Sequence, residues 1–259
     1  MKIIILRFAI TALFGFYSGG ALFSQGSFMD NQRSLIKIAE IFHRCEDSLK
    51  KRFEDKKISW PPKSIYIRAF KYNQLMEVWV KGANTKSYHL YKTDTICMQI
   101  GNTGPKRQQG DLQIPEGFYY IQEFNPNSNY HLSLGLNYPN VSDKIICDSL
   151  RPGGDPGGDI FIHGNCVSVG CLAINDSPIE ELYILAAHAR SNGQDFIPVH
   201  VFPVKFDEES SMEYLDKVTM EDKSLRKFEY TLKEAFDYFE EKKRIPVIMV
   251  NKKGEYIIE

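Results

Sequence analysis

Apolar and polar residues follow two different periods along this chain. Between residues 35 and 53 the apolar positions are spaced by three and four, and charges of both signs fill the opposite face, which is typical of an amphipathic helix packed on a domain. Between residues 64 and 202 short runs of apolar, β-branched and aromatic residues predict strands. These runs are 65–70, 77–81, 88–91, 95–100, 117–121, 130–134, 159–162, 171–174 and 197–202. The core is therefore predicted to be mostly β.

One helix interrupts the predicted strands. Ser177 is expected to be its N-cap and Pro178 its first residue, while Glu180 would close a capping box. Gly193 stands near the expected end, and the apolar positions between give the helix one buried face.

The last fifth of the chain changes pattern again. A helical stretch is predicted from about residue 208 to 244, and two apolar runs, 246–250 and 255–258, then form a hairpin around residues 251–254. The fold class is α+β. The predicted divisions are an N-terminal segment at 1–24, an amphipathic helix at 25–59, a mainly β catalytic domain at 60–205, and a helical extension with a hairpin at 206–259.

The first 24 residues have the order of a secretory signal. Lys2 and Arg7 flank the start of an apolar run over residues 3–16, and small residues follow at 18–21. We expect export and cleavage, with a retained membrane anchor as the alternative. Either outcome places the rest of the chain in the cell envelope or periplasm.

Composition and charge narrow the function classes. The chain of 259 residues is 43% hydrophobic and has 32 Lys and Arg against 33 Asp and Glu, a net charge of −1. These values are ordinary for a folded, soluble protein. A near-neutral chain lacks the basic footprint of phosphate-backbone binding, so no nucleic-acid partner is predicted.

Candidate chemistry is concentrated in residues 160–174. Two apolar runs are separated by a turn of small residues, with His163 at the end of the first run and Cys171 at the start of the second. If the runs pair, imidazole and thiol meet, and an adjacent imidazole can lower a thiol pKa from about 8.5 to roughly 3.5–7.5. The N–H groups of Val169, Gly170 and Cys171 could then form an oxyanion hole.

Three other interpretations fit the same residues. The chain has five cysteines, so at least one thiol stays unpaired within a monomer. A Cys166–Cys171 disulfide suits an exported protein; His163, Cys166 and Cys171 could bind a metal with a fourth ligand; or both cysteines could be small core residues. Spacing alone leaves these possibilities open.

The segment 163–171, with the sequence HGNCVSVGC, resembles the catalytic motif of the murein L,D-transpeptidases, the family with a YkuD-type catalytic domain. Residues 101–107, 110–119 and 124–133 are similar to that family too, most of all to its YafK-like branch. The resemblance extends from about Pro62 to Tyr256 and implies a mixed, mainly β fold.

The resemblance also implies roles. Cys171 corresponds to the nucleophile, His163 to the general base, and the Gly164 carbonyl to the group that orients the imidazole. The partner would be a peptidoglycan stem peptide, cleaved through a Cys thioester without a metal or cofactor. An amine acceptor makes a transpeptidase; water makes an amidase or L,D-carboxypeptidase that releases D-residues or a peptidoglycan-linked outer-membrane lipoprotein.

Two features leave the acceptor open. Val169 stands where many family members have a second histidine, and the interval from His163 to Cys171 is short. A third possibility is a wall-binding domain that keeps the fold without catalysis.

Four residues are candidates for substrate binding: Arg107, Asp111, Tyr130 and Ser168. Arg107, with Lys106, could hold a carboxylate, although exposed loop cations are often only solvated. Asp111 could meet an amine or cap a turn, Tyr130 could line a cleft or pack, and Ser168 could hold the turn before Cys171. The glycine-rich residues 152–159 are interpreted as a lid or a plain connection.

Overall fold

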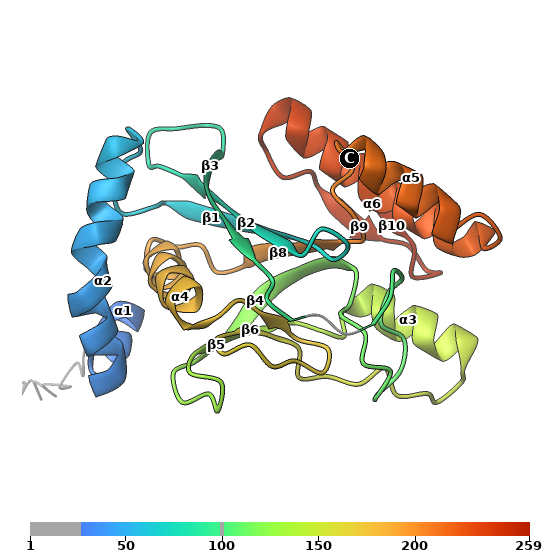
Figure 1. Ribbon diagram of the computed structural model, residues 1–259, viewed down its shortest axis with the longest axis horizontal. Coiled ribbons are helices and arrows are strands. Elements are labelled where there is room, and N and C mark those ends of the chain that lie inside the picture. The colour runs from blue at the N-terminus through green and yellow to red at the C-terminus, as the bar shows by residue number, and fades with distance from the viewer. Residues whose placement is uncertain (1–26, 99–100) are drawn as a thin grey trace, which may run out of the picture.

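A curled mixed sheet of eight strands forms the centre of the molecule (Figure 1). The computed structural model describes residues 27–98 and 101–259, so the predicted signal at 1–24 lies outside the described residues. The sheet order is β3-β2-β1-β8-β4-β5-β6-β7, with parallel pairing at β1–β8 and β6–β7 and antiparallel pairing elsewhere. The strands are β1 (Ser64–Phe70), β2 (Leu75–Lys81), β3 (His89–Thr95), β4 (Gly117–Asn125), β5 (Ser133–Leu136), β6 (Phe161–His163), β7 (Leu172–Ala173) and β8 (Ile197–Phe202).

The chain that leaves β3 returns to the opposite end of this sheet. Met98 forms an antiparallel bridge with Ala173 of β7, and the Cys97 N–H donates to the Ala173 carbonyl at 2.9 Å. The outer side of β7 is therefore occupied by another segment of the same chain.

Two helical layers cover the sheet. On one side α4 (Asp176–Ser191) packs against the strands, and the amphipathic α2 (Ile36–Asp55) packs on α4 (Figure 1). The short α1 (Phe28–Arg33) precedes α2. Because α2 turns an apolar stripe inward, it joins the main core through Ile38, Ile41, Phe42, Leu49 and Phe53.

On the other side lie the C-terminal elements. They are α5 (Glu209–Val218), α6 (Lys223–Lys242) and the hairpin of β9 (Ile248–Val250) and β10 (Tyr256–Ile258). Phe70 and Phe202 from the sheet pack with Phe236 of α6 in a second apolar cluster. The α+β class and the terminal hairpin are confirmed, and the predicted stretch 208–244 contains two helices.

Several local predictions were wrong. The helix expected to begin after Ser177 begins at Asp176, with Asn175 as N-cap and no side-chain cap. Glu180 closes no capping box because its carboxylate is bonded to Arg44 and His131 instead. The strand expected from Tyr130 begins only at Ser133, after a turn.

The helix α3 (Val141–Leu150) was not predicted. Its signal is the N-cap: Asn140 accepts from the Asp143 N–H at 3.0 Å, and Asp143 accepts from the Asn140 N–H at 3.1 Å. Over the residues described, none of the helices has both the length and the apolar character needed to span a bilayer.

Candidate active site

His163 is the last residue of β6, and Cys171 directly precedes the neighbouring parallel strand β7 at the end of the sheet. In the β6–β7 register, Ile162 is opposite Leu172 and His163 is opposite Ala173. Side chains two residues apart on a strand share a face, and directly paired residues do too, so His163 and Cys171 project from one face in a diagonal arrangement. The β6–β7 register thus places the two residues expected to be catalytic on adjacent segments of the chain.

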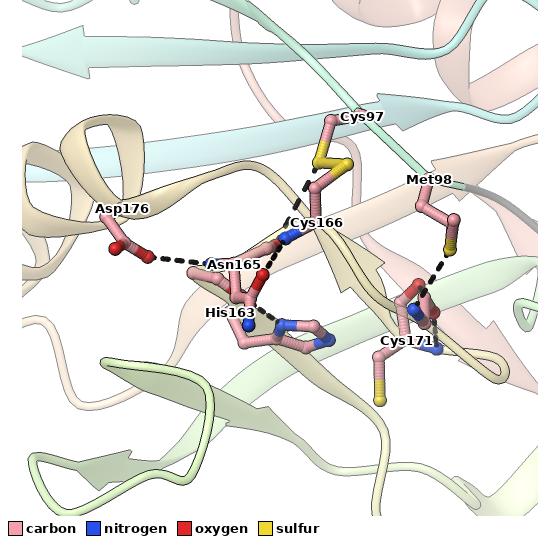
Figure 2. Close-up of a disulfide and its surroundings, with 9 residues drawn as sticks. Cys97, Met98, His163, Asn165, Cys166, Cys171 and Asp176 are labelled. Carbon is pink, nitrogen blue, oxygen red and sulfur yellow. Dashed lines mark hydrogen bonds between the residues drawn. A yellow bond between two sulfur atoms is a disulfide. The ribbon is translucent and has the colours of Figure 1, made fainter.

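The imidazole of His163 is held in one orientation. Its Nδ1 lies 2.6 Å from the Gly164 carbonyl oxygen, which can only accept, so Nδ1 carries the proton and Nε2 keeps its lone pair. The ring of Tyr130 lies against it, with centroids 4.7 Å apart and planes inclined by 30°. Figure 2 shows the ring edge opposite Nδ1 turned toward the Cys171 side chain.

Burial keeps this imidazole neutral. Only 2% of His163 is exposed, and that burial lowers its pKa below the ordinary value, although the bond to Gly164 acts in the opposite direction. A neutral imidazole with a free Nε2 is the form that can accept a proton.

The thiol of Cys171 is free and half-buried. Its Sγ accepts from the Phe161 N–H at 3.4 Å and donates to the Asp159 carbonyl at 3.5 Å. Burial raises the pKa of this thiol, and Asp159 acts in the same direction, whereas the Phe161 N–H and the charge of Lys106 lower it. The expected lowering of the thiol pKa is therefore wrong for this arrangement, because desolvation outweighs the favourable contacts.

The turn before Cys171 is organised by Ser168. Its Oγ accepts from the N–H groups of Cys171 at 2.9 Å and Gly170 at 3.2 Å, and donates to the Cys171 carbonyl at 2.7 Å. Gly170 has φ +127°, and a Cβ there would stand 3.1 Å from the Gln113 carbonyl oxygen, so the position favours glycine. Two of the three amides predicted for the oxyanion hole are thus bonded to a hydroxyl that an oxyanion would have to replace.

Cys166 forms a disulfide with Cys97, whose Cα lies 5.7 Å away. The alternative of a Cys166–Cys171 disulfide is therefore wrong, and Cys166 is not a free metal ligand. The bond ties the 164–171 loop to the chain leaving β3 (Figure 2), where the Met98 Sδ also accepts from the Ser168 N–H at 3.3 Å. Within 27–98 and 101–259, no three His, Cys, Asp or Glu side chains are grouped as a metal site.

The other candidate residues divide into two groups. Tyr130 and Ser168 lie beside the His163–Cys171 pair, as described above. The Arg107 guanidinium instead contacts Asp143 at 3.1 Å and the Phe228 ring at 5.3 Å, on the side of α3 and α6. Asp111 accepts from Lys106 Nζ at 2.5 Å and from three backbone N–H groups, which closes the turn at residues 107–113.

Three residues at the site were missed by the sequence reasoning. They are Cys97, which forms the disulfide; Asp159, whose carbonyl accepts from the thiol; and Asp176, whose Oδ1 accepts from the Asn165 N–H at 2.7 Å. The odd cysteine count indicated unpaired thiols but could not identify the pair, and backbone carbonyls leave no residue-type signal.

Comparison with known proteins identifies the family of this chain. A family model described as the L,D-transpeptidase catalytic domain (YkuD) matches residues 64–201, and the chain belongs to that family. It is 30% identical over 196 residues to the Escherichia coli (strain K12) protein named "Putative L,D-transpeptidase YafK", covering 75% of this chain and 73% of the relative.

Two solved structures are also similar. The helical cell shape determining protein Pgp2 from Campylobacter jejuni has 18% identity and a TM-score of 0.41, covering 73% of each chain. Bd1075 of Bdellovibrio bacteriovorus has 19% identity and a TM-score of 0.38, covering 63% of this chain and 59% of that one.

Proposed function

We propose that this protein is an exported, cysteine-dependent L,D-transpeptidase that acts on peptidoglycan stem peptides through a thioester on Cys171. Membership of the family supports the reaction class. The observation that carries the mechanism is the bond from His163 Nδ1 to the Gly164 carbonyl, because it leaves Nε2 as an acceptor on the side that faces a free thiol.

The reaction proceeds in two proton-balanced stages. Cys171 Sγ rotates from the Asp159 carbonyl toward His163, gives its proton to Nε2, and attacks the carbonyl that follows the third stem residue. The protonated His163 then gives that proton to the departing amine of the terminal D-residue, which leaves a thioester. An incoming amine or water repeats these transfers in reverse and frees the thiol.

A raised thiol pKa suits this order of events. Because both groups are neutral at rest, the proton moves as the carbon–sulfur bond forms, rather than from a stable ion pair. We place Val169, Gly170 and Cys171 around the oxyanion, with Ser168 yielding the Gly170 and Cys171 amides when substrate binds.

The surrounding residues have proposed roles toward the substrate. Tyr130 is 43% exposed beside the imidazole and offers an apolar wall to a stem peptide. Asp111 holds Lys106 in the loop next to Cys171, where Lys106 would meet a stem carboxylate.

Water is the alternative acceptor. In that case the protein is a peptidoglycan amidase or L,D-carboxypeptidase, which releases a D-residue or a linked outer-membrane lipoprotein. Both reactions use the same thioester, so the product distinguishes them. A wall-binding domain without catalysis is disfavoured by the unpaired state of the Cys171 thiol.

One disulfide bond within the fold supports export. The Cys97–Cys166 disulfide is a bond that persists in oxidising compartments such as the periplasm. N-terminal sequencing of the protein recovered from the periplasm tests the predicted removal of residues 1–24.

The decisive experiment incubates the protein with a tetrapeptide-containing muropeptide and with lipoprotein-bearing sacculi, and reads the products by mass. Loss of the D-residue with a new amide bond indicates a transpeptidase; loss with addition of water indicates a hydrolase. Cys171→Ala must abolish either product, while Cys147→Ala, which removes another free thiol in α3, must not. Unchanged turnover by the Cys171 variant would refute the proposal.

A further inference from the structure

The segment Tyr130–His131 contacts both the proposed base, His163, and the neighbouring Gly164. Tyr130 lays its ring against the His163 imidazole. The same two residues leave no room for a side chain at Gly164. A Cβ at that glycine would stand 2.9 Å from the Tyr130 carbonyl oxygen and 3.0 Å from the His131 Cβ. Any shift of this segment would therefore move both the stacked ring and the carbonyl that fixes the tautomer of His163.

His131 adopts a backbone conformation that must be held by contacts. Its φ is +68°, in the left-handed region that residues with a Cβ disfavour. Its carbonyl oxygen accepts from Lys37 Nζ at 2.6 Å, and its Nε2 lies 2.7 Å from Glu180 Oε1. Arg44 Nη2 donates to the same Glu180 oxygen at 2.6 Å. Lys37 and Arg44 are both on α2.

The helix α2 lies outside residues 64–201, the part of the chain that matches the catalytic domain. We propose that α2 is nevertheless a working part of the active site, with Lys37 as a positioning residue that holds Tyr130–His131 against His163 and Gly164. Arg44 assists through Glu180. This inference rests on the proposed function for its kinetic consequence but not for its structural one.

The same pair of helices supplies a matched control. Arg52 of α2 donates to Glu181 of α4 at 2.5 Å, which is the same kind of contact between the same two helices as the Arg44–Glu180 pair. Arg52 and Glu181 bond to each other, and Glu181 also accepts from Lys92, so this contact lies away from residues 130–131. Loss of the Arg52 contact therefore loosens α2 without releasing the segment over the base.

The test compares Lys37→Met with Arg52→Met in the full mature chain. Methionine keeps most of the apolar stem of lysine and removes the charged donor. We expect Lys37→Met to lower kcat about tenfold with KM changed less than twofold, while Arg52→Met leaves both within twofold. Arg44→Met, at a half-exposed position, should lower kcat about threefold. This variant replaces Lys37→Met in the comparison if the Lys37 variant does not fold.

A second measurement does not depend on substrate. The ¹⁵N chemical shifts of the His163 ring report its tautomer. We expect one Nδ1-protonated form in the wild type and in Arg52→Met, and a mixed or exchange-broadened signal in Lys37→Met.

The outcomes are separable. Equal kcat and equal ring shifts in Lys37→Met and the wild type would overturn the proposal, as would equal losses in the Lys37 and Arg52 variants. If the wild type processes no peptidoglycan substrate, the proposed function fails, and the ring shifts alone decide: a change in Lys37→Met supports the role of α2, and no change overturns it.

Discussion

The two ends of the sheet are built in different ways. From β3 to β4 the strands are six to nine residues long, and long ladders of backbone pairs set their positions. From β5 to β7 they shrink to four, three and two residues. At that short end, side chains hold the chain in place: Ser168 bonds its own turn, Cys166 is linked to Cys97, and Asp176 caps Asn165.

The difference bears on the proposed chemistry, which lies at the short end. A long ladder buries its backbone groups in pairing, whereas short strands leave turns whose amides and carbonyls stay within reach of a substrate. The cost is that each cross-link matters more, because few ladder bonds remain to compensate for its loss. Matched substitutions at the two ends should therefore have different consequences.

The largest contrast is expected between two buried histidines. His163→Gln removes the proton acceptor and should lower kcat about 10³-fold, within the range typical of a lost general base. His200, on β8 in the long end, is bonded to the Tyr66 hydroxyl at 2.7 Å, and burial lowers its pKa to about 3. His200→Gln should reduce thermal stability with kcat within threefold. Steady-state kinetics and melting curves check both; a similar rate loss in the two variants would contradict the comparison.

The disulfide should give the next largest effect. Replacing both Cys97 and Cys166 by alanine should lower the free energy of unfolding by about 2–4 kcal/mol, because the bond closes a long loop in the unfolded chain. It should also reduce kcat, since the 164–171 turn loses its anchor. The double variant of the free thiols Cys45 and Cys147 is the control. Urea titrations compare the two, and equal stability losses would count against a special role for the anchored turn.

Removal of one hydroxyl from each end gives a smaller contrast. Ser168→Ala deletes three hydrogen bonds around Cys171 and should lower kcat roughly 10- to 100-fold, the equivalent of about 1–3 kcal/mol for amides left without their partner. Tyr66→Phe deletes one buried hydroxyl from the long end and should cost about 1 kcal/mol of stability with an unchanged rate. If Ser168→Ala keeps its full rate, backbone pairing alone suffices to hold the turn.

The pH dependence should show the smallest change near neutrality. Burial lowers the pKa of His163 from its ordinary value of 6.5. The imidazole therefore remains neutral at and somewhat below pH 6.5, and kcat/KM should fall only in more acidic solution. Burial raises the pKa of Cys171, so its alkylation by iodoacetamide should keep accelerating above pH 9. Rates measured from pH 4 to 10 test both directions. A rate that falls between pH 8 and 7 would show that the imidazole is not kept neutral by burial.

Features that depend on a periodic pattern or a local motif could be predicted from the sequence. The spacing of Leu35, Ile38 and Phe42 predicted α2, and the two apolar runs that flank the 163–171 segment predicted β6 and β7, which pair with each other. These features depend on neighbours in sequence, so one chain suffices to find them.

Features that depend on distant contacts could not be predicted. Glu180 looked like part of a capping box, but Arg44 and His131 compete for its carboxylate from elements 136 and 49 residues away. The direction of the Cys171 pKa shift reverses because burial, invisible in sequence, outweighs the local amide. The direction of the Arg107 side chain was equally hidden, since Asp143 and Phe228 come from α3 and α6.

The bridge between Met98 and Ala173 restricts how an extended peptide can approach. Many proteins recognise peptides by adding them as a new strand to an open sheet edge. Beside Cys171 that docking mode is blocked, because the outer edge of β7 is already paired with residues 97–98 of the same chain. A peptide ligand would therefore approach the sulfur across the loops and not as an added strand on β7.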